Sequence, residues 1–394
     1  MQRRIIKILR AILLAACGLL IGLGLTEALL RLFYTPEDRF LVWRPNLARE
    51  LYPASEIFPG IDGVSRLMTS SDGFRADEFG DPGDYQILAL GGSTTECLYL
   101  DQPETWTQIL QDLLNSQGGH TSWVGNAGRS GLNARHHMVQ VEYLLPQFPQ
   151  IDAIVVLAGV NDFLLTRLRN ADGYNPRFME SAEARARAIP SAFKVVPADY
   201  DLDRSNEPFY RQTAIWRLLR EVKSAILRKV AEENGEFFVQ DEVGQFYAQE
   251  RARRHSSGPY LDVLPDLTSA LGEFRTNLNA IIDHAQKNGV RVVLMTQPSI
   301  WRVDLPSDLD ALLWMGEDSQ GRYYSVGALA EGMAMYNQVV LEVCVERGVE
   351  CLDLASLLPK DGTVFYDEIH FNENGARLVA SALAEFFLTR PPFH

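Results

Sequence analysis

Short apolar runs alternate with longer segments of helical periodicity from residue 85 to the end of the chain. Each run ends in a loop of small or polar residues. This alternation is typical of strand and helix units that build a mostly parallel sheet. The runs predict strands over 85–90, 122–125, 153–158, 290–296 and 349–354, and the periodic segments predict helices over 106–114, 137–145, 267–287, 331–346 and 374–388. We therefore expect an α/β fold, a three-layer α/β/α sandwich around a five-stranded parallel sheet.

Two long stretches break this rhythm, at 163–265 and 301–330, and each follows an expected strand. Ligands bind beyond the carboxyl ends of the strands in open sheets of this kind, so both insertions should overhang that edge and contribute to specificity. Residues 36–84 are rich in Pro, Gly, Asp and aromatic residues and show little periodicity, which predicts an irregular connecting segment. The α/β domain itself is predicted over 85–394.

The N-terminal segment 1–35 combines a basic start with a long uncharged run. Four basic residues and no acidic residue lie in the first ten positions, and the apolar run that follows, 11–30, is interrupted only by Glu27. About 20 apolar residues span a bilayer as a helix. Basic residues before the span place the N-terminus in the cytoplasm and the rest of the chain on the far side. The sequence thus predicts a single-pass anchor in a bacterial inner membrane, with the main domain periplasmic or extracytoplasmic.

Two other interpretations of this N-terminus stay open. One is a cleaved signal peptide, and the other is a lipoprotein signal, because Leu-Ala-Ala-Cys at 14–17 matches the small-residue pattern before a lipidated cysteine. The apolar run continues past Cys17 and ends in charged residues, as a retained anchor does.

Charge and cysteine content narrow the possible partners and ligands. The formal net charge of -14 disfavours nucleic acid as a partner, since a polyanion is repelled by an acidic surface. The four cysteines are too scattered for a disulfide framework or a zinc site, and we expect neither a metal nor a cofactor. Cys344 and Cys351 can pair in an oxidising compartment, but the pattern favours two small buried hydrophobic residues.

Four loops carry side chains suited to catalysis. The loop after the first expected strand is Gly-Gly-Ser-Thr-Thr-Glu at 91–96, which places Ser93 where a strand bends sharply towards a helix N-terminus. The loops after the second and third strands are Asn-Ala-Gly-Arg-Ser-Gly at 126–131 and Gly-Val-Asn-Asp at 159–162. Asp-Glu-Ile-His at 367–370 precedes the last expected helix.

In this order and strand context, the four motifs resemble those of the SGNH hydrolases, also called GDSL esterases and lipases. The resemblance covers the whole predicted α/β domain. It implies that Ser93 is a nucleophile and that Asp367 and His370 complete a catalytic triad. It also implies an oxyanion hole formed by the backbone N–H groups of Ser93 and Gly131 and by the side chain of Asn161.

The first motif departs from the eponymous Gly-Asp-Ser-Leu of the family. Gly92 and Thr94 stand where the family name has Asp and Leu. The departure concerns the local turn geometry and leaves the implied role of Ser93 in place.

The chemistry of acyl transfer requires the same residue types. A serine hydroxyl is a weak nucleophile until a base such as neutral His370 accepts its proton, and Asp367 is close enough in sequence to orient that imidazole. The attack creates an oxyanion, and Gly131 and Asn161 can donate hydrogen bonds to it. Losing one such donor typically costs about 3 to 4 kcal/mol in the barrier. Taken singly, Ser93 or Asp367 also suits a helix cap and Asn161 a turn.

The sequence predicts a serine esterase that hydrolyses an ester bond. The leading substrate class is O-acetyl groups on envelope or exported carbohydrate. Alternatives are an O-acyltransferase acting on polysaccharide with the same residues, and a lysophospholipase or thioesterase. A third is a non-catalytic envelope binding module, whose expected mark, a replaced Ser, Asn or His, is missing from these motifs. The expected partners are the ester substrate, carbohydrate or lipid, and the membrane. The sequence identifies no protein partner.

Overall fold

The computed structural model describes residues 2–33, 39–169, 188–197, 213–216 and 240–394, together with residues 208, 210, 218, 219 and 222. The chain forms two units. The larger comprises residues 40–195 and 237–394, and the smaller comprises residues 1–39 and 196–236.

A five-stranded parallel sheet forms the centre of the larger unit, with the strand order β4-β3-β5-β6-β7. The strands are β3 (Tyr85–Gly91), β4 (Ser122–Asn126), β5 (Ala153–Leu157), β6 (Arg291–Met295) and β7 (Glu350–Leu352). Strands β4 and β5 are buried at every position, which explains why they appear in the sequence as short runs without hydrophobic alternation. The five predicted strands are confirmed.

The strand order reverses at β3, which pairs with β4 on one side and β5 on the other. In the first ladder Tyr85 is opposite Ser122, and in the second Ile87 is opposite Ala153. A reversal of this kind leaves a crevice outside the carboxyl ends of the adjacent strands, where ligands bind in open sheets. The loops after β3, β4 and β5 therefore meet at one point of the sheet edge.

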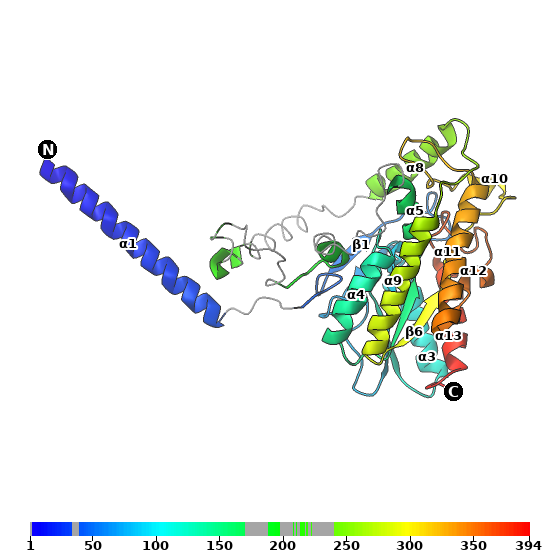
Figure 1. Cartoon of the computed structure of the whole chain (residues 1–394), viewed down its shortest axis with the longest axis horizontal. Helices are drawn as coiled ribbons and strands as arrows, with labels where there is room; N and C mark the ends of the chain where they lie inside the picture. Colours follow the sequence, from blue (N-terminus) through cyan, green and yellow to red (C-terminus); the bar gives the residue numbers. More distant parts are fainter. Residues whose placement is uncertain are drawn as a thin grey trace. The chain divides into compact units, whose positions relative to one another are not determined.

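Helices cover both faces of the sheet, so the predicted three-layer α/β/α architecture is confirmed. Helices α4, α9 and α11 pack side by side, whereas α3 packs against α13 (Figure 1). The crossover from β3 to β4 runs in one direction along the sheet and the later crossovers run in the other, so right-handed connections place their helices on opposite faces. The long helices are α3 (Trp106–Gln117), α4 (Ala134–Gln147), α5 (Val160–Arg169), α8 (Gln240–Ser256), α9 (Thr268–Lys287), α11 (Val326–Arg347) and α13 (Glu373–Leu388). The short ones are α2 (Ser93–Glu96), a 3-10 turn (Gln102–Glu104), α10 (Ser307–Asp310) and α12 (Leu354–Leu357).

Residues 40–84 contain two short strands that the sequence pattern does not predict. Strands β1 (Ala48–Leu51) and β2 (Ser65–Met68) pair antiparallel. Alternate positions of β2 are buried, but one of them is Ser65, whose single hydroxyl hydrogen is shared between the carbonyls of Leu98 and Leu100, at 2.7 and 2.8 Å from Oγ. A buried polar residue hides the period-two hydrophobic signal, so this strand has no signature in the sequence.

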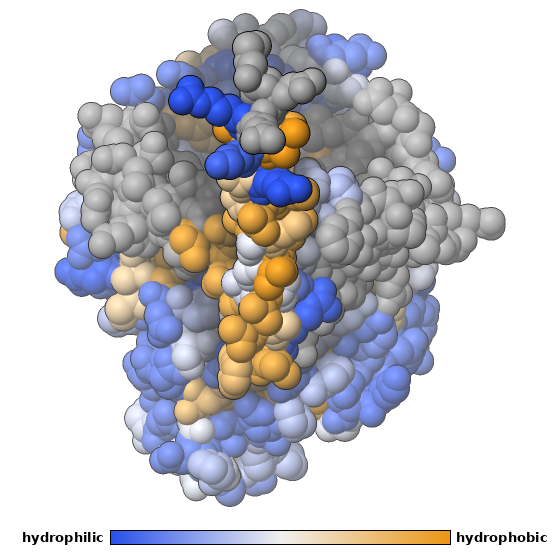
Figure 2. Space-filling model, turned by 90° about the vertical axis from the view of Figure 1, so that its left-hand side faces the viewer, coloured by the Kyte–Doolittle hydropathy of each residue, from blue (hydrophilic) through white to orange (hydrophobic). Residues whose placement is uncertain are grey.

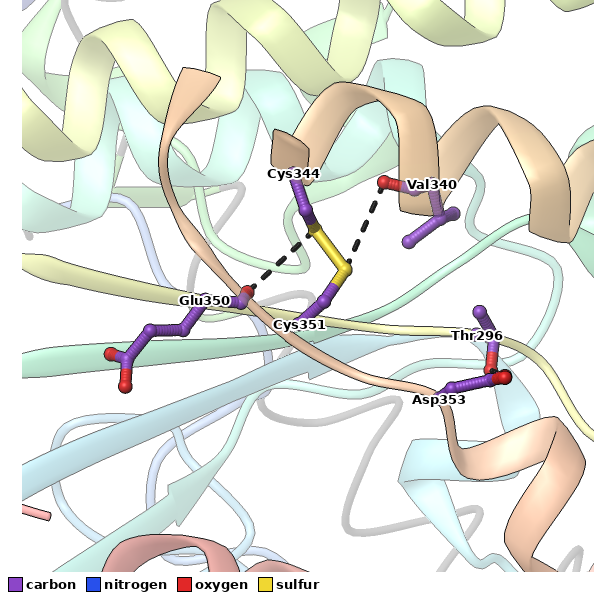
Figure 3. The surroundings of a disulfide bond; sticks show 6 residues. All are labelled: Thr296, Val340, Cys344, Glu350, Cys351 and Asp353. Carbon is purple, nitrogen blue, oxygen red and sulfur yellow. Dashed lines mark hydrogen bonds between the residues drawn. A yellow bond between two sulfur atoms is a disulfide. The ribbon is translucent and has the colours of Figure 1, made fainter. Parts of the chain in front are cut away.

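A disulfide joins Cys344, near the end of α11, to Cys351 in β7 (Figure 3). The Cα atoms of the two cysteines are 6.0 Å apart, within the usual range for a disulfide. The interpretation of these cysteines as two small buried hydrophobic residues is therefore wrong. The sequence alone did not reveal that the chain turns back directly from α11 into the edge strand, which brings the two residues together. Cys17 and Cys97 are free.

Replacing both Cys344 and Cys351 by Ser should lower the free energy of unfolding by about 2 to 3 kcal/mol, because the bond closes a short loop in the unfolded chain. Urea unfolding followed by tryptophan fluorescence measures the change. The wild type in reducing buffer should match the double variant. Equal stability of the variant and the oxidised wild type would show that the bond contributes nothing.

The smaller unit contains α1 (Gln2–Phe33), with a mean hydropathy of 2.3 over its apolar stretch. Among the described residues it is the one helix long and apolar enough to cross a membrane, and it equally fits a signal sequence. Figure 2 shows its apolar surface. Glu27 forms a 2.7 Å ion pair with Arg31 and accepts the backbone N–H groups of Ala214 and Ile215 at 2.9 and 3.1 Å. These donors satisfy the one acidic group in the apolar stretch.

Candidate active site

Ser93, His370 and Asp367 form one chain of hydrogen bonds although Ser93 lies 277 residues before His370. His370 Nε2 is 2.7 Å from Ser93 Oγ, and His370 Nδ1 is 2.7 Å from Asp367 Oδ2. The other carboxylate oxygen of Asp367 accepts the backbone N–H groups of Ile369 and His370 at 2.9 and 2.8 Å. A base in contact with a hydroxyl and held by a carboxylate is the arrangement that activates a nucleophile.

Close packing around the turn after β3 requires its two glycines. A Cβ atom at Gly91 would lie 2.1 Å from Thr95 Oγ1, and one at Gly92 would lie 2.4 Å from Asn161 Nδ2. Because real Cβ atoms essentially never approach this closely, neither position accepts a side chain without a shift of its neighbour. The presence of Gly92 where the family motif has Asp thus leaves the room that the Asn161 side chain occupies.

The loops after β4 and β5 bring Gly131 and Asn161 to the same place. Asn161 Nδ2 donates to the carbonyl of Leu132 at 2.7 Å, and the site of the missing Gly92 side chain lies between these two groups. Gly131 has a φ of +78°, a left-handed conformation that favours glycine, and open space lies on its Cβ side. All five residues implied by the family resemblance therefore lie at the switch point of the sheet.

Burial and charge act in opposite directions on the His370–Asp367 pair. Burial raises the pKa of Asp367, but the charge and hydrogen bond of His370, together with the backbone hydrogen bonds from Ile369 and His370, outweigh it and hold the pKa below its ordinary value. Burial lowers the pKa of His370, but the charge and hydrogen bond of Asp367, together with the charges of Glu368 and Glu96, outweigh it and leave the pKa above its ordinary value. The pair is thus set to stabilise an imidazolium next to a carboxylate, the ionic state that follows removal of a serine proton.

The model of the GDSL-like lipase/acylhydrolase family matches residues 89–262, which include Ser93, Gly131 and Asn161. The matched segment resembles a GDSL-like lipase/acylhydrolase domain, and this match supports a carboxylic ester hydrolase. No curated protein matches the chain.

Several solved structures resemble this chain at low identity. The acetylxylan esterase Axe2 from Geobacillus stearothermophilus is 13% identical with a TM-score of 0.39, covering 77% of this chain and 94% of its own. A putative lipolytic protein of the G-D-S-L family from Desulfitobacterium hafniense is 10% identical with a TM-score of 0.38, covering 77% and 99%. A lipolytic G-D-S-L protein from Veillonella parvula is 13% identical with a TM-score of 0.39, covering 78% and 99%.

Two buried charged residues that the motifs do not predict hold the turn that carries Ser93. The Arg75 guanidinium donates to the carbonyls of Glu96, Cys97 and Leu100 at 2.5, 2.7 and 2.7 Å. The Glu96 carboxylate accepts both the backbone N–H and the hydroxyl of Ser130, the residue before Gly131. Glu96 belongs to the Gly-Gly-Ser-Thr-Thr-Glu motif, but nothing in the sequence connects Arg75 to it.

The loop before α13 is held by two further groups that sequence reasoning missed. The buried Glu368 carboxylate accepts the backbone N–H groups of Trp314 and Met315, at 3.1 and 2.5 Å from Oε1. The Tyr366 ring stacks on the His370 imidazole, with centroids 5.4 Å apart and planes 7° apart. Burial, followed by the charge of Asp367, raises the pKa of Glu368 to about 7. Trp314 and Met315 belong to the 301–330 insertion, which therefore contacts the site directly.

The raised pKa of Glu368 predicts a stability that depends on pH. Its folded-state pKa of about 7 exceeds the ordinary 4.5, so the protonated form stabilises the fold below about pH 4.5 and this contribution is lost as pH rises through 7. The loss amounts to about 3 kcal/mol at 1.36 kcal/mol per pKa unit. The side chain of Glu368→Gln cannot ionise, so the variant does not lose this stability. Between pH 4.5 and 8 the unfolding free energy of the variant should therefore rise relative to that of the wild type by about this amount.

Urea unfolding at several pH values measures this difference. Asp162 also has a pKa of about 7, raised by burial, but it is present in both proteins and its contribution cancels. A difference that stays constant with pH would contradict the prediction.

Proposed function

We propose that this protein is a serine esterase in which Ser93 is the nucleophile, His370 the general base and Asp367 the residue that orients the imidazole. The observation that carries the proposal is the hydrogen-bond chain from Ser93 Oγ through both ring nitrogens of His370 to Asp367, with 2.7 Å at each step. With Asp367 accepting from Nδ1, Nε2 is the nitrogen free to accept the serine proton.

The oxyanion that forms on attack is proposed to bind the backbone N–H groups of Ser93 and Gly131 and the side chain of Asn161. Ser93 is the first residue of α2, where backbone N–H groups have no partner within the helix. Asn161 Nδ2 carries two hydrogens, and the carbonyl of Leu132 accepts one of them. The second hydrogen can then bind the oxyanion next to Gly92, which has no side chain to block it.

The reaction proceeds in two steps through an acyl-enzyme. Ser93 Oγ attacks the ester carbonyl and gives its proton to His370 Nε2, and the tetrahedral intermediate collapses as His370 protonates the leaving alcohol. Water then gives a proton to His370 and attacks the acyl group. The second intermediate releases the acid while the proton returns to Ser93.

We propose O-acetyl groups on envelope or exported carbohydrate as the substrate class, on the basis of location. Residues 1–35 serve as a retained inner-membrane anchor with a cytoplasmic N-terminus, 36–84 as the connecting segment and 85–394 as the periplasmic catalytic domain. The apolar α1 and its basic start support the anchor and its orientation. The Cys344–Cys351 disulfide supports an oxidising compartment.

The test uses the full chain in detergent with an activated acetate ester, a fluorophosphonate probe and acetylated oligosaccharides. We expect turnover of the activated ester, labelling that maps to Ser93, and release of free acetate from the oligosaccharide. Acetate that appears instead on an added oligosaccharide acceptor would identify a transferase. A folded protein that neither turns over the ester nor reacts with the probe would overturn the proposal.

A further inference from the structure

We propose that Trp314, from the 301–330 insertion, is a positioning residue that holds Asp367 in place for His370 through its indole N–H. The inference rests on the proposed roles of Ser93, His370 and Asp367 and adds a residue that lies outside the four motifs. Trp314 Nε1 donates to Asp367 Oδ2 at 3.1 Å, and the same oxygen is 2.7 Å from His370 Nδ1.

The carboxylate of Asp367 has no spare acceptor site. An ionised carboxylate offers about four lone-pair directions. Four donors occupy them: the backbone N–H groups of Ile369 and His370 on Oδ1, and the side chains of His370 and Trp314 on Oδ2. Asp367 is fully buried, so water does not replace a lost donor. Removing the indole N–H therefore leaves one oxygen held by the imidazole alone, the group that must move a proton.

The surroundings of Trp314 fix its ring in this position. Its backbone N–H and that of Met315 are bound by the Glu368 carboxylate, the residue next to Asp367. Its ring meets the ring of Tyr247 with centroids 5.1 Å apart and that of Phe246 with centroids 5.7 Å apart, both in edge geometry. Two kinds of hydrogen bond therefore hold the insertion to the carboxylates of Asp367 and Glu368. The backbone of the insertion donates to Glu368, and the Trp314 side chain donates to Asp367.

This arrangement has a defined effect on catalysis. The Trp314 N–H shares the charge of Asp367 Oδ2 with the imidazole and restricts rotation of the carboxylate, so the Asp367–His370 bond keeps one geometry. Among the described residues, the largest charge effects on His370 come from Asp367, Glu368 and Glu96. All three remain when Trp314 is replaced, so a change in the titration of His370 would report on the lost hydrogen bond.

The test compares Trp314→Phe with a variant that carries benzothienylalanine at 314, in which sulfur replaces the indole N–H and the ring shape is kept. Both should lower kcat for an activated acetate ester by about ten- to a hundredfold with little change in KM, the range expected for loss of a hydrogen bond to a charged group. In both, the acidic limb of the kcat/KM profile should move to higher pH, because the less neutralised carboxylate stabilises the imidazolium more strongly.

Trp301→Phe is the matched control. Trp301 is fully buried in the same part of the chain, and its Nε1 has no hydrogen-bond partner among the described residues. This variant should keep the wild-type kcat and pH profile. A benzothienyl variant with wild-type kcat and an unshifted limb, or a loss confined to KM, would overturn the role of Trp314. Absence of Ser93-dependent turnover in the wild type would instead overturn the proposed function.

Discussion

Ser93→Ala should reduce kcat for hydrolysis of an activated acetate ester by about a millionfold. The Ser93 hydroxyl is the one in contact with His370 Nε2, at 2.7 Å, so no other described group replaces it as nucleophile. Removal of either the serine or the histidine of such a triad has about the same effect as removal of both. His370→Ala and the double variant should therefore match Ser93→Ala within about tenfold.

The matched control is Ser381→Ala. Ser381 is an exposed serine on α13 whose hydroxyl donates to the carbonyl of Arg377. It should retain full activity and full labelling by a fluorophosphonate, whereas Ser93→Ala should retain its fold by circular dichroism and lose both. Residual turnover of Ser93→Ala above about one per cent of wild type would mean that another nucleophile acts, and losses that add in the double variant would mean that Ser93 and His370 do not act as a unit.

The central sheet and the chemistry-bearing loops were predictable because both depend on short-range patterns. A strand buried on both faces appears in the sequence as an apolar run, and the glycine turn that follows it marks the carboxyl end of the strand. The ends of β3, β4 and β5 therefore located Ser93, Gly131 and Asn161. The spacing in Asp-Glu-Ile-His brought Asp367 close to His370 for the same local reason.

The groups that support the site were not predictable because they depend on contacts distant in sequence and invisible in periodicity. Arg75 is a buried charged residue whose guanidinium donates to backbone carbonyls. A charged residue in a sequence normally indicates a position on the protein surface. Trp314 reaches Asp367 from an insertion without a recognisable motif. The disulfide partners Cys344 and Cys351 needed the geometry of the α11–β7 turn. In each case the tertiary arrangement decides, and local propensity carries no signal.

Asp367→Asn should lower kcat/KM by about ten-thousandfold while leaving the fold intact. Asp367 Oδ1 accepts two backbone N–H groups, so the carbonyl oxygen of the new amide must take that position. Its NH2 group then faces His370 Nδ1 and the indole N–H of Trp314, both of which donate to Oδ2 in the wild type. Two donors cannot face each other, so the Trp314 N–H loses its acceptor and His370 adopts the tautomer with Nδ1 as acceptor and the proton on Nε2.

In that tautomer Nε2 has no lone pair with which to take the Ser93 proton, so the acylation step fails although every heavy atom is near its original place. Pre-steady-state kinetics with the activated ester should show the burst of acyl-enzyme slowed by the same factor as kcat/KM. Asp353→Asn is the matched control. Asp353 accepts a hydrogen bond of 2.7 Å from the Thr296 hydroxyl (Figure 3), and the amide oxygen of an asparagine can accept the same bond. If Asp367→Asn instead kept more than a tenth of the wild-type rate, Asp367 would not be the residue that sets the tautomer of His370.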